Sequence, residues 1–220
     1  MLSIWIGHAG SGKSARVLET IQRERENRPQ LLLVPEHTSH EAELDLCRFC
    51  GPTACRSAEV LTFQSLATRV LGETGGLADV TLDNGGKLLT MRRCLQELHT
   101  QLKVFGRPSQ RSAFLHQLTT LADEFYAYQI APETLYHHVE DMEGAMGDKL
   151  RDVALIFAAY DAKLRHGGTD TRSRVQKLHD SLPQSHYLDG KDLYLDGFSF
   201  FYKQEESVLA LALRQSKTPD

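Results

Sequence analysis

The sequence predicts an α/β protein in which a parallel sheet is interrupted by an all-helical segment. Short strand-like segments recur at 31–34, 59–62 and 192–198. The continuous apolar run at 31–34 is typical of a strand that is buried on both faces, as strands are in parallel sheets. Residues 84–182, by contrast, show no alternation with a period of two. We therefore expect only helices within residues 84–182.

A glycine-rich loop near the N-terminus fits the phosphate-loop pattern G-x-x-x-x-G-K-[ST]. Its residues, all candidates for nucleotide binding, are Gly7, His8, Ala9, Gly10, Ser11, Gly12, Lys13 and Ser14. In this pattern the glycines let backbone N–H groups wrap a phosphate, the lysine contacts the β- and γ-phosphates, and the hydroxyl binds Mg²⁺. The helix that follows offers its N-terminal dipole to the same anion. Residues 2–6 are apolar and β-prone, so we expect a strand directly before the loop.

The rest of the N-terminal part alternates between helices and strands. The expected elements are a helix over 14–25, a strand over 31–34, a helix over 40–50, a strand over 59–62 and a helix from 63 to about 71. Pro35 ends the first of these strands. Thr38 or Ser39 is expected to cap the helix over 40–50, because short hydroxyl side chains satisfy the free N–H groups of a helix start.

The middle of the chain carries helical spacing throughout. Helices are expected around 88–98 and 114–125, as a short helix that begins at Pro132, and around 150–164 and 173–182. The strand at 192–198 and a helix over 202–214 follow. We therefore expect a nucleotide-binding core formed by residues 1–83 and 184–220, and an inserted helical domain over 84–183. The core shows fewer strands than a complete nucleotide-binding sheet normally has.

Composition narrows the class of protein. A net charge of −4 over 220 residues argues against a generally basic nucleic-acid coat protein. The 4 cysteines are unevenly spaced, unlike a secreted disulfide framework. The N-terminus does not resemble a signal peptide, and no apolar run approaches the ~20 residues of a membrane span. These features predict a soluble, cytoplasmic protein without a membrane partner.

Cysteines and histidines gather near residue 50. Cys47, Cys50 and Cys55, with His37 and His40 upstream, raise the alternative of a metal site. A structural zinc site needs two well-spaced pairs of ligands, and Cys47 falls on a predicted helix. We therefore interpret these cysteines as buried or idle thiols.

Asp196 stands at the end of the last apolar strand. ATPases with a phosphate loop need an acid at such a position to hold Mg²⁺, and many of them have a glutamate next to it that orients the attacking water. Here the next residue is Gly197, which has no acid–base group. The sequence thus predicts a site that holds Mg-nucleotide through Ser14 and Asp196 but lacks the water-activating carboxylate. Loss of a general base costs a factor of about 10²–10⁴ in rate.

These segments, in this order, resemble the N-terminal part of the B subunit of bacterial ATP-dependent helicase/nucleases, the AddB (RexB) family. The resemblance covers essentially the whole chain. Besides the phosphate loop, it rests on residues 32–36 (LLVPE, with its first Leu at 32 and Glu at 36), 59–67 (EVLTFQSLA), Gly86-Lys87, 149–156 and 195–198 (LDGF).

The resemblance implies a RecA-like, superfamily-one helicase-like domain with a helical insertion. It implies ATP and Mg²⁺ as cofactors, and a heterodimer with an A subunit that carries the working motor. Together the two subunits would process double-stranded and single-stranded DNA during double-strand-break resection and recombination. The nuclease and the iron–sulfur cluster of the family lie far C-terminal, outside this chain.

The family's site residues carry over by position. Lys13 and Ser14 match the phosphate and Mg²⁺ residues, and Asp196 matches the Mg²⁺ acid. Thr38 lies in a segment with which helicases touch the DNA backbone. Phe63 and Gln64 lie where they have a Phe-His-Ser loop, although Gln64 replaces the histidine, and Phe63 has the alternative of being a core residue.

Three functions remain open at this point. The first is a nucleotide-binding, non-motor scaffold of a DNA-end-processing complex, whose isolated domain has no helicase or nuclease activity. The second is a small-molecule kinase, a phosphotransferase with a helical lid. The third is a degenerate loop that binds no nucleotide.

Overall fold

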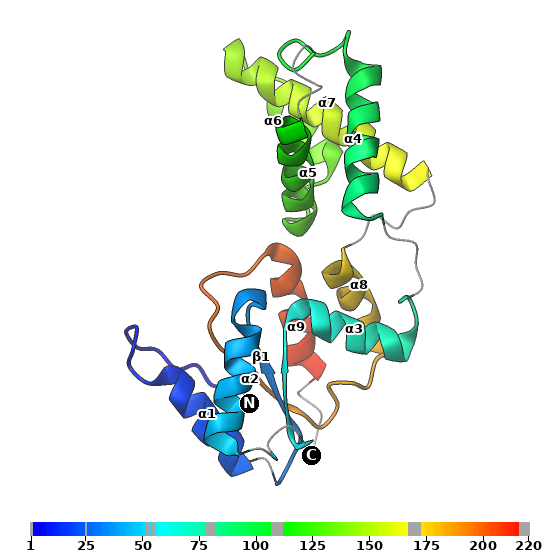
Figure 1. Cartoon of the computed structure of the whole chain (residues 1–220). Coiled ribbons are helices and arrows are strands. Elements are labelled where there is room, and N and C mark those ends of the chain that lie inside the picture. Colours follow the sequence, from blue (N-terminus) through cyan, green and yellow to red (C-terminus); the bar gives the residue numbers. More distant parts are fainter. Residues whose placement is uncertain are drawn as a thin grey trace. The chain divides into compact units, whose positions relative to one another are not determined.

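The computed structural model divides the chain into two compact units (Figure 1). Unit 1 comprises Met1–Leu77 and Arg174–Asp220, and unit 2 comprises Ala78–Ser173. The residues that the structure describes are 2–24, 26–51, 53, 56–77, 82–106, 112–166 and 173–215. Cys55 lies outside them.

Unit 1 is built on a parallel sheet of three strands, in the order β2-β1-β3. The strands are β1 (Gln30–Leu33), β2 (Ala58–Leu61) and β3 (Asp192–Leu195). In the register, Leu32 of β1 lies beside Val60 of β2 and Tyr194 of β3. The prediction of an α/β fold with a parallel sheet is therefore confirmed. Because the strands are parallel, their carboxyl ends meet at one edge of the sheet.

Both faces of this sheet are covered by helices, which explains the unbroken apolar run of β1. Leu32 belongs to a core cluster with residues of α1 (Lys13–Glu24) and α2 (Ser39–Cys50). Leu31 and Leu33 belong to a second cluster, with residues of three other helices. These are α3 (Phe63–Thr74), α8 (Arg174–Ser181) and α9 (Lys203–Gln215). Neighbouring side chains of a strand point to opposite faces, so each cluster collects alternate residues.

Helix α8 and the short 3₁₀ helix η3 (Leu182–Gln184) belong to unit 1. Val175, Leu178 and Leu182 are buried in the same cluster as residues of α3 and α9. From the sequence we expected this helix in the inserted helical segment. Helical spacing alone does not show which core a helix joins, because it identifies the apolar face of the helix but not the partner of that face.

Unit 2 consists, in its described residues, of α-helices and their connections. They are α4 (Asn84–Leu98), α5 (Ser112–Ala127), α6 (Pro132–Val139) and α7 (Gly144–His166). Their apolar faces share one core, in which Leu95, Ile156 and Tyr160 are almost fully buried. The start of α4 is capped by Asp83, whose carboxylate accepts the N–H of Gly86 at 2.7 Å.

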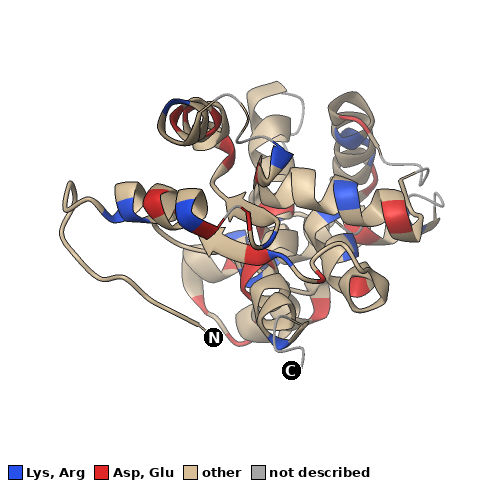
Figure 2. Ribbon diagram, turned by 90° about the horizontal axis from the view of Figure 1, so that it is seen from below, with Lys and Arg blue, Asp and Glu red and all other residues tan. Residues whose placement is uncertain are grey.

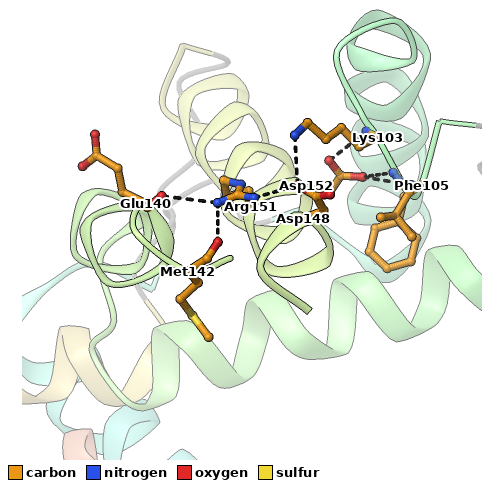
Figure 3. Close-up of polar contacts among 8 residues, drawn as sticks. Lys103, Phe105, Glu140, Met142, Asp148, Arg151 and Asp152 are labelled. Atoms are coloured by element: carbon orange, nitrogen blue, oxygen red, sulfur yellow. Dashed lines mark hydrogen bonds and ion pairs between the residues drawn. The ribbon is translucent and has the colours of Figure 1, made fainter. Parts of the chain in front are cut away.

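Polar groups of α7 hold two connections of unit 2 (Figure 3). The carboxylate of Asp152, only 3% exposed, accepts the backbone N–H groups of Lys103, Val104 and Phe105 at 3.0, 2.7 and 2.9 Å. The guanidinium of Arg151 donates to the carbonyl of Met142 at 2.6 Å. The chain segments before α5 and before α7 are thus fastened to the long helix α7.

The N-terminal strand predicted over residues 2–6 is not formed. Residues 2–8 have no regular structure, and the side chain of Ile6 is 94% exposed. Trp5 alone packs against the cluster of α1 and α2, with the guanidinium of Arg16 5.4 Å from its ring centre. A short β-prone segment needs a hydrogen-bonded neighbour to be stable as a strand. None of the three described strands pairs with this segment, which is why the prediction was wrong.

Candidate functional site

The glycine-rich loop turns sharply before α1. Gly10 and Gly12 have φ angles of +73° and +83°, a left-handed conformation that glycine adopts without steric cost. A Cβ on Gly7 would stand 2.5 Å from Oγ of Ser11. The backbone of this loop therefore favours glycine at positions 10 and 12, whereas a side chain at position 7 would first displace the hydroxyl of Ser11. The predicted junction of loop and helix is present, although the strand before it is absent.

Lys13 is enclosed by the loop that it ends. Its ammonium group donates to the carbonyls of Gly7 and His8 at 2.9 and 2.7 Å. Ser14 follows in the first turn of α1 and is exposed. The loop projects from the start of α1, as Figure 1 shows in dark blue and Figure 2 shows again from below. An exposed loop with a lysine at a helix N-terminus can attract an anion through its charge, its N–H groups and the helix dipole.

Asp196 lies at the carboxyl edge of the sheet, directly after β3. Its backbone N–H donates to the carbonyl of Leu33 at 3.2 Å, which continues the pairing with β1. Its carboxylate is half-buried and makes no hydrogen bond or ion pair with the described residues. No hydrogen bond or ion pair joins it to Ser14, which is also described. The structure thus has a free acid at the predicted position, without a contact to the predicted second Mg²⁺ residue.

A groove of about 840 Å³ runs along the outer edge of β2. Residues of α2 line one side, residues of α3 line the other, and all of β2 lines the floor. Gln64 is exposed on the α3 side. Thr38 lies beside the lining residues Glu36 and Ser39, and its hydroxyl donates to the carbonyl of Pro35 at 3.0 Å. Thr38 occupies the cap position of α2 without a side-chain cap bond, so the predicted cap interaction is absent.

Phe63 is a core residue. It is 4% exposed, and its ring centre lies 5.8 Å from that of Phe198 and 6.5 Å from that of Phe201. Both pairs have edge-to-face geometry, which aromatic rings favour. The ring therefore has no free face on which a DNA base could stack. Of the two interpretations of Phe63, the structure supports a core residue and not a base-stacking one.

The groove also contains acidic residues that the sequence patterns did not single out. Glu36 and Glu43 are exposed on the α2 side, and neither carboxylate has a hydrogen bond or ion pair among the described residues. Glu59, on β2, is paired with Arg69 of α3 at 2.6 Å. Burial, together with the hydrogen bond to Glu59, raises the pKa of Tyr187. His40, Glu43 and Cys47 are spaced so that they lie on one face of a helix, and this face of α2 lines the groove. That spacing was the sequence signal from which the polar wall could have been predicted.

The described residues contain no group of three or more metal-ligating side chains. Cys50 is buried, with its sulfur 3.7 Å from the carbonyl of Leu18. Cys94 is buried in the core of unit 2, where desolvation raises its pKa to about 11. Both thiols thus occupy structural positions. Among the described helices none has the length and apolar character that crossing a lipid bilayer requires.

Comparison with known proteins gives one consistent result. The chain is 32% identical to the B subunit of the ATP-dependent helicase/deoxyribonuclease of Geobacillus thermodenitrificans (strain NG80-2), over 98% of this chain and 20% of that protein. It is 33% identical to the protein of the same name from Clostridium botulinum (strain Hall), over 96% of this chain and 19% of that one. The corresponding Clostridioides difficile (strain 630) protein is 30% identical, over 97% and 19%.

The chain therefore spans about a fifth of the length of these relatives. The family model described as "ADDB, N-terminal" matches residues 4–218, which is nearly the whole chain. On this evidence the chain belongs to the family of AddB N-terminal regions.

Proposed function

We propose that this chain is the helicase-like N-terminal domain of the B subunit of an ATP-dependent helicase/deoxyribonuclease, and that it binds nucleotide through residues 7–14. The observation that carries the proposal is the pair of hydrogen bonds that the Lys13 ammonium donates to the carbonyls of Gly7 and His8, at the N-terminus of α1. This arrangement holds a positive charge where the phosphate-loop pattern needs one. Family membership and the parallel sheet of unit 1 support a RecA-like assignment.

The residues of the chain have distinct parts in this binding. The N–H groups of the loop and the ammonium of Lys13 would hold the phosphates of ATP. Ser14 and Asp196 would hold Mg²⁺, which neutralises phosphate charge when bound. The free carboxylate of Asp196 at the carboxyl edge of the sheet is consistent with this part, because ligands of open α/β sheets bind at that edge.

The domain is proposed as a scaffold without motor activity of its own. Gly197, which follows Asp196, has no carboxylate to orient a water molecule. The names of the relatives describe one subunit of an enzyme that acts on DNA with ATP. We therefore propose an A subunit as partner and DNA ends undergoing break repair as the substrate of the assembly. Gln64 lines a groove in which Glu36 and Glu43 are unpaired among the described residues, and Thr38 lies beside it. Negative charge repels a phosphate backbone, so we assign no DNA contact to Thr38 or Gln64.

Titration of the chain with Mg-ATP tests the proposal. Lys13→Ala removes a charge-assisted contact worth about 1.5–3 kcal/mol, so the affinity should fall about 10- to 100-fold. Lys149→Ala is the control, because Lys149 is an exposed lysine of α7 in unit 2. It should bind as the unmodified chain does. Equal affinity of the two variants would refute the assignment of the loop.

A second titration isolates the proposed Mg²⁺ residue. Asp196→Asn should weaken binding of Mg-ATP but leave binding of ATP in EDTA unchanged, because only the metal contact is removed. ATP hydrolysis should be negligible in every variant. If Asp196→Asn binds both forms of ATP as the unmodified chain does, Asp196 is not a Mg²⁺ residue.

A further inference from the structure

The outer edge of β2 carries backbone groups that the sheet does not use. Within the described residues β2 pairs only with β1. The carbonyls of Ser57 and Leu61 accept the N–H groups of Gln30 and Val34 of the β1 segment at 2.7 and 2.9 Å. The backbone groups of successive strand residues point to alternate sides. The N–H and C=O groups of Ala58 and Val60 therefore point away from β1, to the outside of the sheet.

These outward groups open into the groove described above. Ala58 and Val60 both line it, between one helix from each face of the sheet. Helix α2 packs on the face to which Ala58 and Val60 point their side chains, and α3 packs on the opposite face with Leu61. An extended chain lying beside β2 would therefore point alternate side chains toward α2 and toward α3, because strand residues alternate between faces.

The two walls of the groove differ in charge. The α2 wall presents Glu43 of α2 and Glu36 of η1 (Glu36–Thr38), the 3₁₀ helix directly before it, and both carboxylates are exposed and unpaired among the described residues. On the other wall, Arg69 is already neutralised by Glu59 at 2.6 Å. Arg174 of α8 also lines the groove and has no ion pair among the described residues. The unpaired charge of the α2 wall is negative, which repels a phosphate backbone and attracts lysine or arginine.

We propose that the groove binds an extended segment of a partner protein, which adds to β2 as a further strand and points lysine or arginine side chains toward α2 at alternate positions. The main-chain hydrogen bonds of the added strand supply affinity, and the pockets for alternate side chains supply specificity. This surface is separate from the nucleotide loop and does not depend on nucleotide binding.

The first test uses a capped synthetic peptide, Thr-Lys-Thr-Lys-Thr-Lys-Thr, and amide hydrogen exchange measured by NMR. Binding should slow exchange at Ala58 and Val60, whose N–H groups gain a partner. The N–H groups of Glu59 and Leu61 face β1 and should change little. The same peptide methylated at two of its strand-facing nitrogens loses two hydrogen bonds of about 0.5–1.5 kcal/mol each, so it should bind at least about fivefold more weakly.

The second test concerns the charges. Glu36→Gln and Glu43→Gln should each weaken peptide binding about two- to fivefold, as expected for exposed charge pairs. Glu19→Gln is the control, since Glu19 is an exposed residue of α1 outside the groove. None of these variants should change the affinity for Mg-ATP. If Lys13→Ala leaves the affinity for Mg-ATP unchanged, the proposed nucleotide site is wrong. The proposal for the groove is unaffected, because residues 7–14 do not line it.

Two outcomes would overturn the inference. The first is equal binding of the methylated and unmethylated peptides, since backbone pairing would then contribute nothing. The second is tighter binding of a short oligothymidylate than of the peptide, with the same protection at Ala58 and Val60. The groove would then be a nucleic-acid site, and the carboxylates of Glu36 and Glu43 would not select its ligand.

Discussion

Gly197 lies against the ring of Pro35 at the carboxyl edge of the sheet. A Cβ on Gly197 would stand 3.4 Å from Cδ of Pro35, and the φ angle of Gly197 is +79°. The N–H of Asp196 donates to the carbonyl of Leu33, so the turn after β3 is tied to the end of β1. The glycine is therefore required by the backbone. The glycine after Asp196 thus has a structural cause.

Gly197→Ala should destabilise unit 1 by about 1–2 kcal/mol, because a residue with a Cβ is strained at positive φ. Gly85→Ala is the control. Gly85 lies in the first turn of α4, where an added Cβ would meet only the carboxylate of Asp83, at 3.5 Å. This second change should be neutral or slightly stabilising. Urea denaturation measures both changes, and equal losses of stability would contradict the argument.

Gly197→Glu should not produce an ATPase. The glutamate would begin from a backbone conformation that L-residues rarely adopt, so its carboxylate would not be held in a fixed position. A correctly placed general base raises a rate about 10²–10⁴-fold. We expect phosphate release by this variant to remain at the level of the unmodified chain, with or without DNA. A rise of about tenfold or more would show that the turn accepts the side chain.

Phe63→Ala should cost unit 1 about 3–5 kcal/mol, the usual loss for removing a buried aromatic ring. The ring contacts Phe198 and Phe201 at the start and end of the segment that follows Asp196. Its neighbour Gln64 is exposed, so Gln64→Ala should change the free energy of unfolding by no more than about 0.5 kcal/mol. Denaturation curves of the two variants decide the point: similar midpoints would mean that Phe63 is not a core residue.

The helices and the strands that form the sheet could largely be predicted from hydrophobic spacing. The run at 31–34 has apolar side chains on both faces. In the structure its adjacent residues Leu31 and Leu32 belong to the two cores on opposite faces of the sheet. The same signal failed for residues 2–6. Local sequence gives the tendency to be extended, whereas a strand also needs a neighbour, and none of the described strands pairs with this segment.

The residue types of the candidate site could be predicted from the sequence. The structural elements that surround these residues could be predicted less well. Gly12, a fixed glycine of the loop pattern, has a positive φ angle, which is the conformation that favours glycine. The free edge of β2, and the position of Glu43 beside it, depend on how the sheet ends and which helices overhang it. Tertiary packing determines both, and periodicity within a single helix does not reveal them.

His186 should titrate above the ordinary histidine range. Its ring shares a hydrogen bond with the carboxylate of Asp189 at 2.8 Å, and this bond, aided by the negative charges of Asp189 and Glu73, raises its pKa. The stabilising contribution is therefore complete below about pH 6.5 and is lost as the pH rises through the raised pKa. Asp189→Asn should move the pKa back toward its ordinary value, as an NMR titration of the ring would show. Asp141→Asn, in a turn of unit 2, should have no effect on it.

Glu73 gives stability the opposite dependence on pH, because its pKa is lowered whereas that of His186 is raised. Hydrogen bonds from Ser185 and from the N–H of His186 lower its pKa. Its contribution is complete above about pH 4.3 and is lost as the pH falls through the lowered pKa. Together the two groups favour the connection between η3 and β3 most between about pH 4.3 and 6.5. If the protection factors of the amides in this connection, each corrected for the intrinsic exchange rate, are equal at pH 5.5 and pH 8, His186 does not hold it.

Asp152 is expected to be among the most sensitive positions of unit 2. Its carboxylate accepts three backbone N–H groups, from Lys103, Val104 and Phe105, while 3% exposed. Asp152→Asn keeps the size of the side chain but replaces one acceptor oxygen by an NH₂ group that faces these donors. Leaving buried N–H groups unpaired costs about 1–3 kcal/mol each, so we expect a loss of about 2–4 kcal/mol in the free energy of unfolding of this unit.

The matched control is Asp148, one turn earlier on α7. Its carboxylate pairs with Arg151 at 2.6 Å and Lys103 at 2.9 Å at the surface (Figure 3). Water can replace these partners, so Asp148→Asn should cost clearly less than Asp152→Asn. Amide exchange of Lys103 and Phe105 gives an independent measure: it should accelerate in Asp152→Asn and hardly change in Asp148→Asn. Equal acceleration in both variants would mean that the surface ion pairs, and not the buried carboxylate, hold the segment before α5.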